Sequence, residues 1–130
     1  MTIPFACVLA YLGIIYLTRF PVVMAQRADP KGYDNHHPRD QQGRLVGWGR
    51  RAQAAHQNGF EMFAPFAAGV LIAHVTGCDP RWMSYLSLGF VGSRVLYPIL
   101  YIADLPSMRS LVWMVGFACA VALYFLPMFR

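Results

Sequence analysis

The residues best able to do chemistry in this chain lie where a polar segment passes into a long apolar run, between positions 49 and 72. At about 100° per residue, Arg51, Asn58 and Glu61 fall within one narrow stripe of a helix, while His56 points to the other side. A carboxylate inside an apolar span is unfavourable in a bilayer unless it faces protein, water or a ligand. The shared face of these side chains, which continues to Pro65, is therefore the candidate site.

A second set of capable side chains lies in the segment S-R-V-L-Y-P-I-L-Y. Arg94, Tyr97 and Tyr101 are spaced i, i+3 and i+7, which places all three on one helix face. Arg94 falls inside an apolar span, so it must snorkel, form an ion pair or face an interior cavity. Glu61 is the only acidic residue within a span and is its expected partner. The pair could be a buried structural clamp or part of a functional site.

The composition is that of a membrane protein. Hydrophobic residues make up 57% of the 130 positions, and they come in blocks long enough for a helix of about 20 residues to cross a bilayer. The three cysteines show no metal-ligand spacing and are interpreted as small buried apolar residues. The net charge of +5 lies mostly in one loop between the spans, which fits membrane orientation or an anionic ligand. We expect membrane lipids, and no nucleic acid, as partners.

The elements that must position these residues are four membrane-spanning helices in one all-α domain, residues 1–130. The second and third connections are short, which makes neighbouring helices antiparallel and predicts a four-helix antiparallel bundle. Pro21 is expected to kink or end the first helix, and Asp79 to cap the third. The predicted helices are about 3–25, 44–75, 81–103 and 107–129.

The long polar segment 26–43 is predicted to be an irregular loop, because it is rich in Asp, Asn, Pro and Gly. Asp34, His36 and His37 could in principle bind a metal. Adjacent histidines point in different directions on a regular backbone, however, so a solvated loop is favoured and no metal site is expected.

The distribution of arginine and lysine predicts the orientation in the membrane. With four crossings, the first and third loops share one side and hold most of the basic residues, whereas the other side holds Arg81 and the terminal Arg130. The positive-inside rule then places the long first loop in the cytoplasm and both termini on the opposite side.

Two motifs in this order resemble those of a known family. Arg51, Ala52, Asn58, Glu61 and Pro65 resemble the signature of the MAPEG family, the membrane-associated proteins of eicosanoid and glutathione metabolism. The later R-x-x-Y-x-x-x-Y, followed by Arg109, is similar to the family's second signature. The segment A-Q-R-A at the end of the first helix is close to the A-R-R-A of its leukotriene-synthase branch. The resemblance covers essentially the whole chain.

The resemblance implies a homotrimer that binds glutathione, as co-substrate, between neighbouring subunits near the cytoplasmic face. It implies a membrane-bound glutathione transferase, with peroxidase activity as a further possibility, acting on lipophilic small molecules that enter from the bilayer. Arg109 resembles the residue that stabilises the thiolate, and Arg27 the loop arginine of the same pocket. The implied glutathione-binding residues are Arg51, Asn58, Glu61, Arg94, Tyr97 and Tyr101.

Two positions depart from the family pattern and leave an alternative open. Ala54 stands four residues before the asparagine, where family members usually carry an arginine, and Gln26 replaces the first arginine of A-R-R-A. Arg51 lies one turn from Ala54 on the same stripe and could compensate. The alternative is a non-catalytic scaffold or lipid-binding trimer that has lost glutathione chemistry, in which Glu61 and Arg94 clamp helices together.

Overall fold

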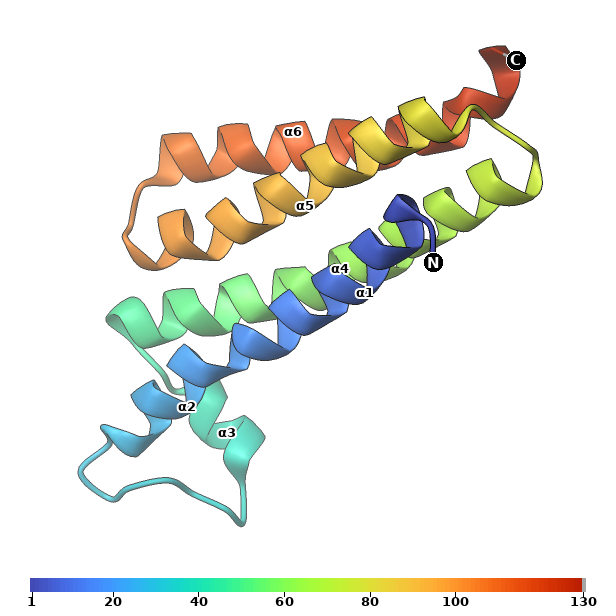
Figure 1. Ribbon diagram of the computed structural model, residues 1–130. Coiled ribbons are helices and arrows are strands. Elements are labelled where there is room, and N and C mark those ends of the chain that lie inside the picture. The colour runs from blue at the N-terminus through green and yellow to red at the C-terminus, as the bar shows by residue number, and fades with distance from the viewer. Residues whose placement is uncertain (130) are drawn as a thin grey trace.

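A computed structural model describes residues 1–129 and confirms the all-helical architecture (Figure 1). Four of its helical segments are long and apolar enough to cross a membrane. Residue 130, whose charge entered the predicted topology, lies outside the described residues. The helices are α1 (Ile3–Leu17), α2 (Arg19–Arg27), α3 (Pro38–Gly43), α4 (Gly47–Val75), α5 (Pro80–Ile102) and α6 (Pro106–Phe125), followed by the 3₁₀ helix η1 (Leu126–Phe129).

The long helices run alongside one another as two pairs, with α1 and α2 along α4, and α5 along α6 (Figure 1). Further contacts of α4 with α5 and α6, and of α1 with α5, join the two pairs. Both termini lie at the same end of the bundle as the α4–α5 turn, while the α2–α3 connection and the α5–α6 turn lie at the other (Figure 1). This antiparallel order brings the start of α4 close to the end of α5.

The first span is broken at Thr18 into α1 and α2, one turn before Pro21. Proline has no N–H to donate, and its ring clashes with the carbonyl four residues earlier, here that of Leu17. The expected interruption therefore occurs on the N-terminal side of the proline. The Thr18 hydroxyl donates to the Ile15 carbonyl at 2.6 Å and stabilises the break.

The polar segment after the first span is more ordered than the predicted loop. It contains the short helix α3, and α4 begins at Gly47 rather than near residue 44. A buried amide pair, Gln26 and Gln41, holds the segment together: Gln26 Nε2 donates to the Gln41 side-chain oxygen at 3.2 Å, and Gln41 Nε2 donates to the Gln26 carbonyl at 3.2 Å. Gln41 Nε2 also donates to the Gly32 carbonyl at 2.8 Å. Side-chain amides can form hydrogen bonds with the backbone groups of a loop in this way, because each amide has both a donor and an acceptor.

The backbone at the two ends of α4 explains where this helix starts and how the next one begins. Gly47 has a φ of +56°, a left-handed conformation that glycine adopts without steric strain. Beyond the other end, the Asp79 carboxylate accepts a hydrogen bond from the Arg81 amide at 2.8 Å, which confirms the predicted cap of α5.

Asp34 organises the turn that precedes α3. Its Oδ1 accepts hydrogen bonds from the backbone amides of His37 at 2.9 Å and His36 at 3.0 Å. These amides hold the pKa of the Asp34 carboxyl below its usual range. The carboxylate thus stabilises the backbone conformation of the turn.

The interior of the bundle is built on three aromatic side chains, one from each of α1, α4 and α5. Phe66 and Phe90 stack with ring centroids 3.9 Å apart, and Tyr11 meets Phe90 edge-on at 4.9 Å. The Tyr11 hydroxyl donates to the Gly59 carbonyl at 2.9 Å, so its polar end is satisfied inside the protein. This cluster fixes α4 against α5 just beyond the candidate site.

Close approach of α5 and α6 depends on Gly116. A Cβ at this position would collide with the Ser93 hydroxyl, beside the Arg94 side chain. We therefore expect Gly116→Ala to lower the free energy of unfolding in detergent by about 1–2 kcal/mol, because overpacking outweighs the gain in helix propensity. Thermal unfolding followed by circular dichroism would measure this.

Gly92→Ala is the matched control for that substitution. Gly92 lies in α5, and a Cβ there would meet no atom within 4 Å. It should be neutral or stabilising by up to about 1 kcal/mol. Equal destabilisation by both substitutions would show that close packing of α5 against α6 at Gly116 is not the cause of the effect.

Candidate functional site

The centre of the candidate site is a hydrogen-bonded chain that joins α4 to α5. Arg94 of α5 is 2% exposed, and its Nη2 donates to Asn58 Oδ1 at 3.0 Å. The amide nitrogen of Asn58 donates in turn to Glu61 Oε2 at 3.1 Å. Asn58 and Glu61 meet because they are three residues apart on α4. The two motifs found in the sequence therefore come together in space.

The prediction of a direct ion pair between Arg94 and Glu61 is wrong, because the two side chains are linked through Asn58. In residues 1–129, the one ion pair with nitrogen and oxygen within 4.0 Å joins Arg51 to Asp104. Asn58 lies between Arg94 and Glu61, because its amide offers an acceptor to the arginine and a donor to the carboxylate. Neither Arg94 nor Glu61 therefore has an oppositely charged partner within 4.0 Å in residues 1–129.

The two charged ends of this chain differ in exposure. Glu61 is exposed on the surface of the single subunit, whereas Arg94 is buried and its Nη1 has no hydrogen-bond partner in residues 1–129. A buried guanidinium nitrogen without a partner is destabilising, because its lost hydration is not replaced by a hydrogen bond.

The tyrosines extend the site along α5 toward α6. The Arg94 guanidinium carbon lies 4.3 Å from the Tyr97 ring centroid, and the Tyr97 and Tyr101 rings meet edge-on at 5.6 Å. Arg109, from the first turn of α6, lies 4.4 Å from the Tyr101 ring centroid. Cation–π contacts hold Arg94 and Arg109 at opposite ends of the tyrosine pair, and neither contact neutralises the charge of the arginine.

Arg109 also borders a cavity of about 290 Å³. The cavity is lined by Tyr97, Tyr101, Arg109, Ser110, Trp113 and Met114. Trp113 stacks on Phe117 at 5.0 Å, which gives the far wall a rigid apolar surface. A guanidinium, two phenol rings and an apolar wall around one space can hold an anionic or easily ionised group next to a hydrophobic one.

We define the polar row as the six residues Glu61, Asn58, Arg94, Tyr97, Tyr101 and Arg109. Its members come from α4, α5 and the start of α6, and each contacts the next. The row presents a carboxylate, an amide, two guanidinium groups and two phenols. It can therefore bind a ligand that carries charges of both signs.

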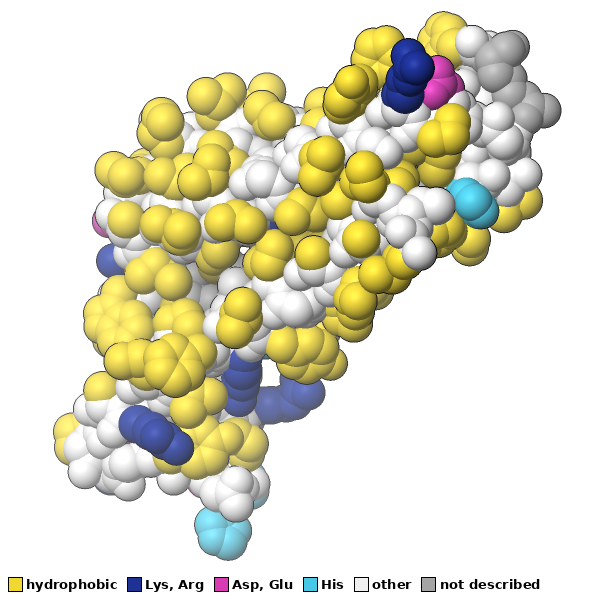
Figure 2. All heavy atoms as spheres, viewed as in Figure 1, with side chains coloured by type: hydrophobic (Ala, Val, Ile, Leu, Met, Phe, Trp, Pro, Cys, Tyr) yellow, Lys and Arg dark blue, Asp and Glu magenta, His cyan; other side chains and the backbone are white. Residues whose placement is uncertain are grey.

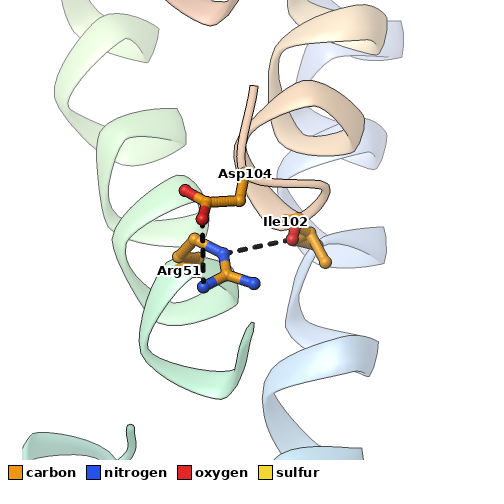
Figure 3. Close-up of polar contacts among 3 residues, drawn as sticks. All are labelled: Arg51, Ile102 and Asp104. Carbon is orange, nitrogen blue, oxygen red and sulfur yellow. Dashed lines mark hydrogen bonds and ion pairs between the residues drawn. The ribbon is translucent and has the colours of Figure 1, made fainter. Parts of the chain in front are cut away.

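Arg51, although on the same stripe of α4, is engaged elsewhere. Its Nε donates to the Ile102 carbonyl at 3.1 Å, and its Nη1 lies 4.0 Å from Asp104 Oδ2 (Figure 3). The contact ties the start of α4 to the end of α5 and to the α5–α6 turn. Asp104 has a φ of +60°, so the contact fixes a left-handed backbone residue in that turn.

Arg27, like Arg51, is a predicted site residue that the structure leaves apart from the polar row. It is exposed in the last turn of α2, and no hydrogen bond or ion pair in residues 1–129 joins it to the polar row. Its neighbour Gln26 is fully buried in the amide pair with Gln41 and faces the protein interior. Gln26 therefore stabilises the loop.

Three residues near the site were not identified from the sequence. Asp104 holds Arg51, and Ser110 and Met114 line the cavity beside Arg109. Asp104 lies in a short turn that gives no periodic signal. Ser110 and Met114 lie one and five residues after Arg109 on α6, about 100° and 140° around the helix from it, so the helical spacing that defined the second motif gives no signal for them.

Comparison with known proteins agrees with the geometry. A family model described as the MAPEG family matches residues 3–129. No curated protein and no solved structure gives a significant match to the chain.

Proposed function

Because this chain belongs to the MAPEG family, we propose that it is a membrane-bound glutathione transferase, which adds the glutathione thiolate to lipophilic electrophiles. The family places the protein in the membrane, in agreement with its four spanning helices. The observation that carries the proposal is the polar row, in which charges of both signs lie within one connected set of side chains.

The chemistry of glutathione matches this set. The tripeptide has two carboxylates, an ammonium group and a thiol. Arg94, with its unpartnered Nη1, suits a carboxylate, because a guanidinium forms paired charge-assisted hydrogen bonds with it. Glu61 suits the ammonium group, and its bond from Asn58 fixes its position.

Arg109 is proposed to activate the thiol. A guanidinium near a thiol lowers the thiol pKa and raises the fraction of thiolate, which is the nucleophile. The thiolate then attacks the electrophilic carbon, a carbon–sulfur bond forms, and the leaving group departs with the electron pair of its bond. The apolar wall at Trp113 is suited to the electrophile.

The exposure of Glu61 supports assembly as a homotrimer. A carboxylate on the outer surface of a spanning helix is unfavourable against lipid. A neighbouring subunit that covers this face would remove Glu61 from lipid and complete the site. The end of the bundle with the α2–α3 connection and the α5–α6 turn is proposed to be cytoplasmic, because it carries most of the basic residues.

Titration of the purified, detergent-solubilised protein with glutathione tests the proposal. Thiolate absorbance in the ultraviolet is expected to rise with saturation at neutral pH, where free glutathione thiol is mostly protonated. S-methyl glutathione, which cannot ionise at sulfur, should compete for binding without giving the signal. Absence of both the signal and heat of binding would reject the transferase.

A second candidate function is a non-catalytic scaffold or lipid-binding trimer. Two observations favour it: the Arg51 guanidinium is occupied by Ile102 and Asp104, and Gln26 is occupied by the loop. With Ala54 neutral, neither position that departs from the family pattern supplies a free positive charge. In this function Glu61 and Arg94, which are joined through Asn58, hold subunits or helices together.

Glu61→Ala separates the two functions. For a transferase we expect glutathione affinity to fall by about 10–100-fold, because one charge-assisted hydrogen bond to the ammonium group is lost, with the oligomer unchanged. For a scaffold the oligomer should dissociate. Calorimetry and size-exclusion chromatography with light scattering measure the two outcomes.

Asp79→Ala is the control for removal of a carboxylate. Asp79 caps α5 at the opposite end of the bundle. It should change neither the affinity for glutathione nor the oligomer.

A further inference from the structure

The turn between α5 and α6 has an unusual residue at its left-handed position. The Leu105 amide donates to the Leu100 carbonyl at 3.0 Å. The Asp104 amide donates to the Tyr101 carbonyl at 3.1 Å, and Asp104 has a φ of +60°. These two bonds and the left-handed residue form a Schellman motif, in which that residue is usually glycine.

The turn between α4 and α5 has the same backbone and follows the usual rule. The Cys78 amide donates to the Ala73 carbonyl at 3.0 Å. The Gly77 amide donates to the His74 carbonyl at 3.0 Å, and Gly77 has a φ of +73°. Glycine adopts this conformation without steric cost, whereas a residue with a Cβ does not. The backbone of the α5–α6 turn therefore does not explain Asp104.

The side chain of Asp104 is placed opposite an arginine from α4. Arg51 Nη1 lies 4.0 Å from Asp104 Oδ2, and Arg51 Nε donates to the Ile102 carbonyl at 3.1 Å (Figure 3). Ile102 is the last residue of α5, where a carbonyl has no partner within its own helix. One guanidinium thus contacts both the end of α5 and the left-handed residue of the turn.

This contact contributes little to the stability of the fold. Figure 2 shows charged side chains at the end of the bundle that carries the α5–α6 turn, beyond the hydrophobic flank of the long helices. The side chains of Arg51 and Asp104 are 31% and 70% exposed, and ion pairs this open to solvent are weak. The left-handed backbone is also unfavourable for aspartate. What the contact offers is a defined geometry of the turn.

The group whose position depends on this turn is Arg109. The Arg109 amide donates to the Leu105 carbonyl at 3.0 Å, so the first turn of α6 continues directly from the α5–α6 turn. The Arg109 guanidinium carbon lies 4.4 Å from the ring centroid of Tyr101, which directly precedes Ile102. A shift of the turn would therefore move Arg109 relative to Tyr101 and to the cavity that both line.

We propose that Arg51 and Asp104 are positioning residues, which fix the α5–α6 turn and thereby hold the Arg109 guanidinium at the edge of its cavity. Neither residue touches glutathione. The inference rests on the proposed function, in which Arg109 activates the thiol, and it gives Arg51 a role other than the glutathione contact that the family resemblance implies.

Arg51→Gln and Asp104→Asn test the proposal in the detergent-solubilised full chain. Both variants should lower kcat for glutathione conjugation by about tenfold, because a small displacement of a reacting or activating group is costly. The pKa of bound glutathione thiol should rise in both, so that activity recovers at higher pH. The double variant should be no slower than either single variant, because the two residues act as one unit.

Glutathione affinity distinguishes positioning from direct binding. By calorimetry, both single variants should keep the wild-type affinity within about twofold. If Arg51 instead binds glutathione, Arg51→Gln should weaken binding, whereas Asp104→Asn should release the guanidinium and keep or strengthen binding. Opposite effects of the two substitutions would overturn the proposal.

Asp104→Gly separates the positioning role from a role in stability. Glycine relieves the left-handed backbone and removes the carboxylate, so thermal stability should stay unchanged or rise while kcat falls as in Asp104→Asn. A loss of stability together with unchanged kcat would overturn the proposal. The matched control is Gly77→Asp, which places aspartate in the same motif at the far end of the bundle. It should lower thermal stability and leave kcat unchanged.

Amide hydrogen exchange followed by mass spectrometry tests the turn without glutathione. Peptides that cover residues 103–110 should exchange about tenfold faster in Arg51→Gln and Asp104→Asn than in the wild type, because the turn opens more often. Unchanged exchange in both variants would overturn the proposal. Faster exchange in a protein that neither binds nor conjugates glutathione would keep the role of Arg51 and Asp104 in holding the turn and would reject the transferase alone.

Discussion

Arg109→Ala is expected to lower kcat for glutathione conjugation by about 10²–10³-fold, the usual effect of removing one preorganised group that stabilises developing charge. Arg109 lies against Tyr101 at the edge of a cavity and has no carboxylate partner in residues 1–129, so its charge is available to a thiolate. Steady-state kinetics with an aryl halide electrophile would measure the change.

The pH dependence distinguishes activation of the thiol from a loss of packing. Without the guanidinium, the pKa of bound glutathione thiol should rise toward the ordinary thiol value of about 8.5. The thiolate fraction at neutral pH then falls, and activity should recover as the pH is raised. Arg109→Lys retains a charge and should recover part of the rate.

Arg81→Ala provides the matched loss of an arginine at the far end of the bundle. Arg81 lies in the first turn of α5, beside its cap, and its replacement should change neither turnover nor glutathione binding. Unchanged turnover in Arg109→Ala, with the oligomer intact, would remove Arg109 from the mechanism.

Arg94→Met is expected to weaken glutathione binding by about 100-fold, or about 3 kcal/mol, because a buried charged partner of a ligand carboxylate is removed. The same change should leave thermal stability unchanged or raise it. Arg94 is buried with Asn58 as its one hydrogen-bond partner in residues 1–129, and an apolar side chain of similar length avoids the desolvation of the guanidinium. Calorimetry and thermal unfolding in the same detergent measure both quantities.

The opposite signs of these two effects make the result informative. A residue kept for function is often unfavourable for stability. If Arg94→Met instead unfolds the protein or dissociates the oligomer, Arg94 is a structural clamp and the scaffold function gains support. Arg94→Lys retains the charge but not the planar fork, so it should bind glutathione with intermediate affinity.

The sequence by itself determined the helices and the two motifs. Long apolar blocks separated by Gly, Pro and Asp turns specify spanning helices, because a bilayer requires backbone groups to be satisfied within each segment. Helical spacing put Arg94, Tyr97 and Tyr101 on one face, and Asn58 with Glu61 on another. These relations are local, since they depend on the period of one helix.

Only the tertiary structure decided how the motifs meet. That Asn58 lies between Arg94 and Glu61, that Arg51 is held by Asp104, and that Gln26 is buried against Gln41 all depend on the relative rotation and depth of separate elements. Helical periodicity says which residues share a face but not which face of a neighbouring helix it meets. Packing of Tyr11, Phe66 and Phe90 fixes that rotation, and with it the partner of each charged side chain.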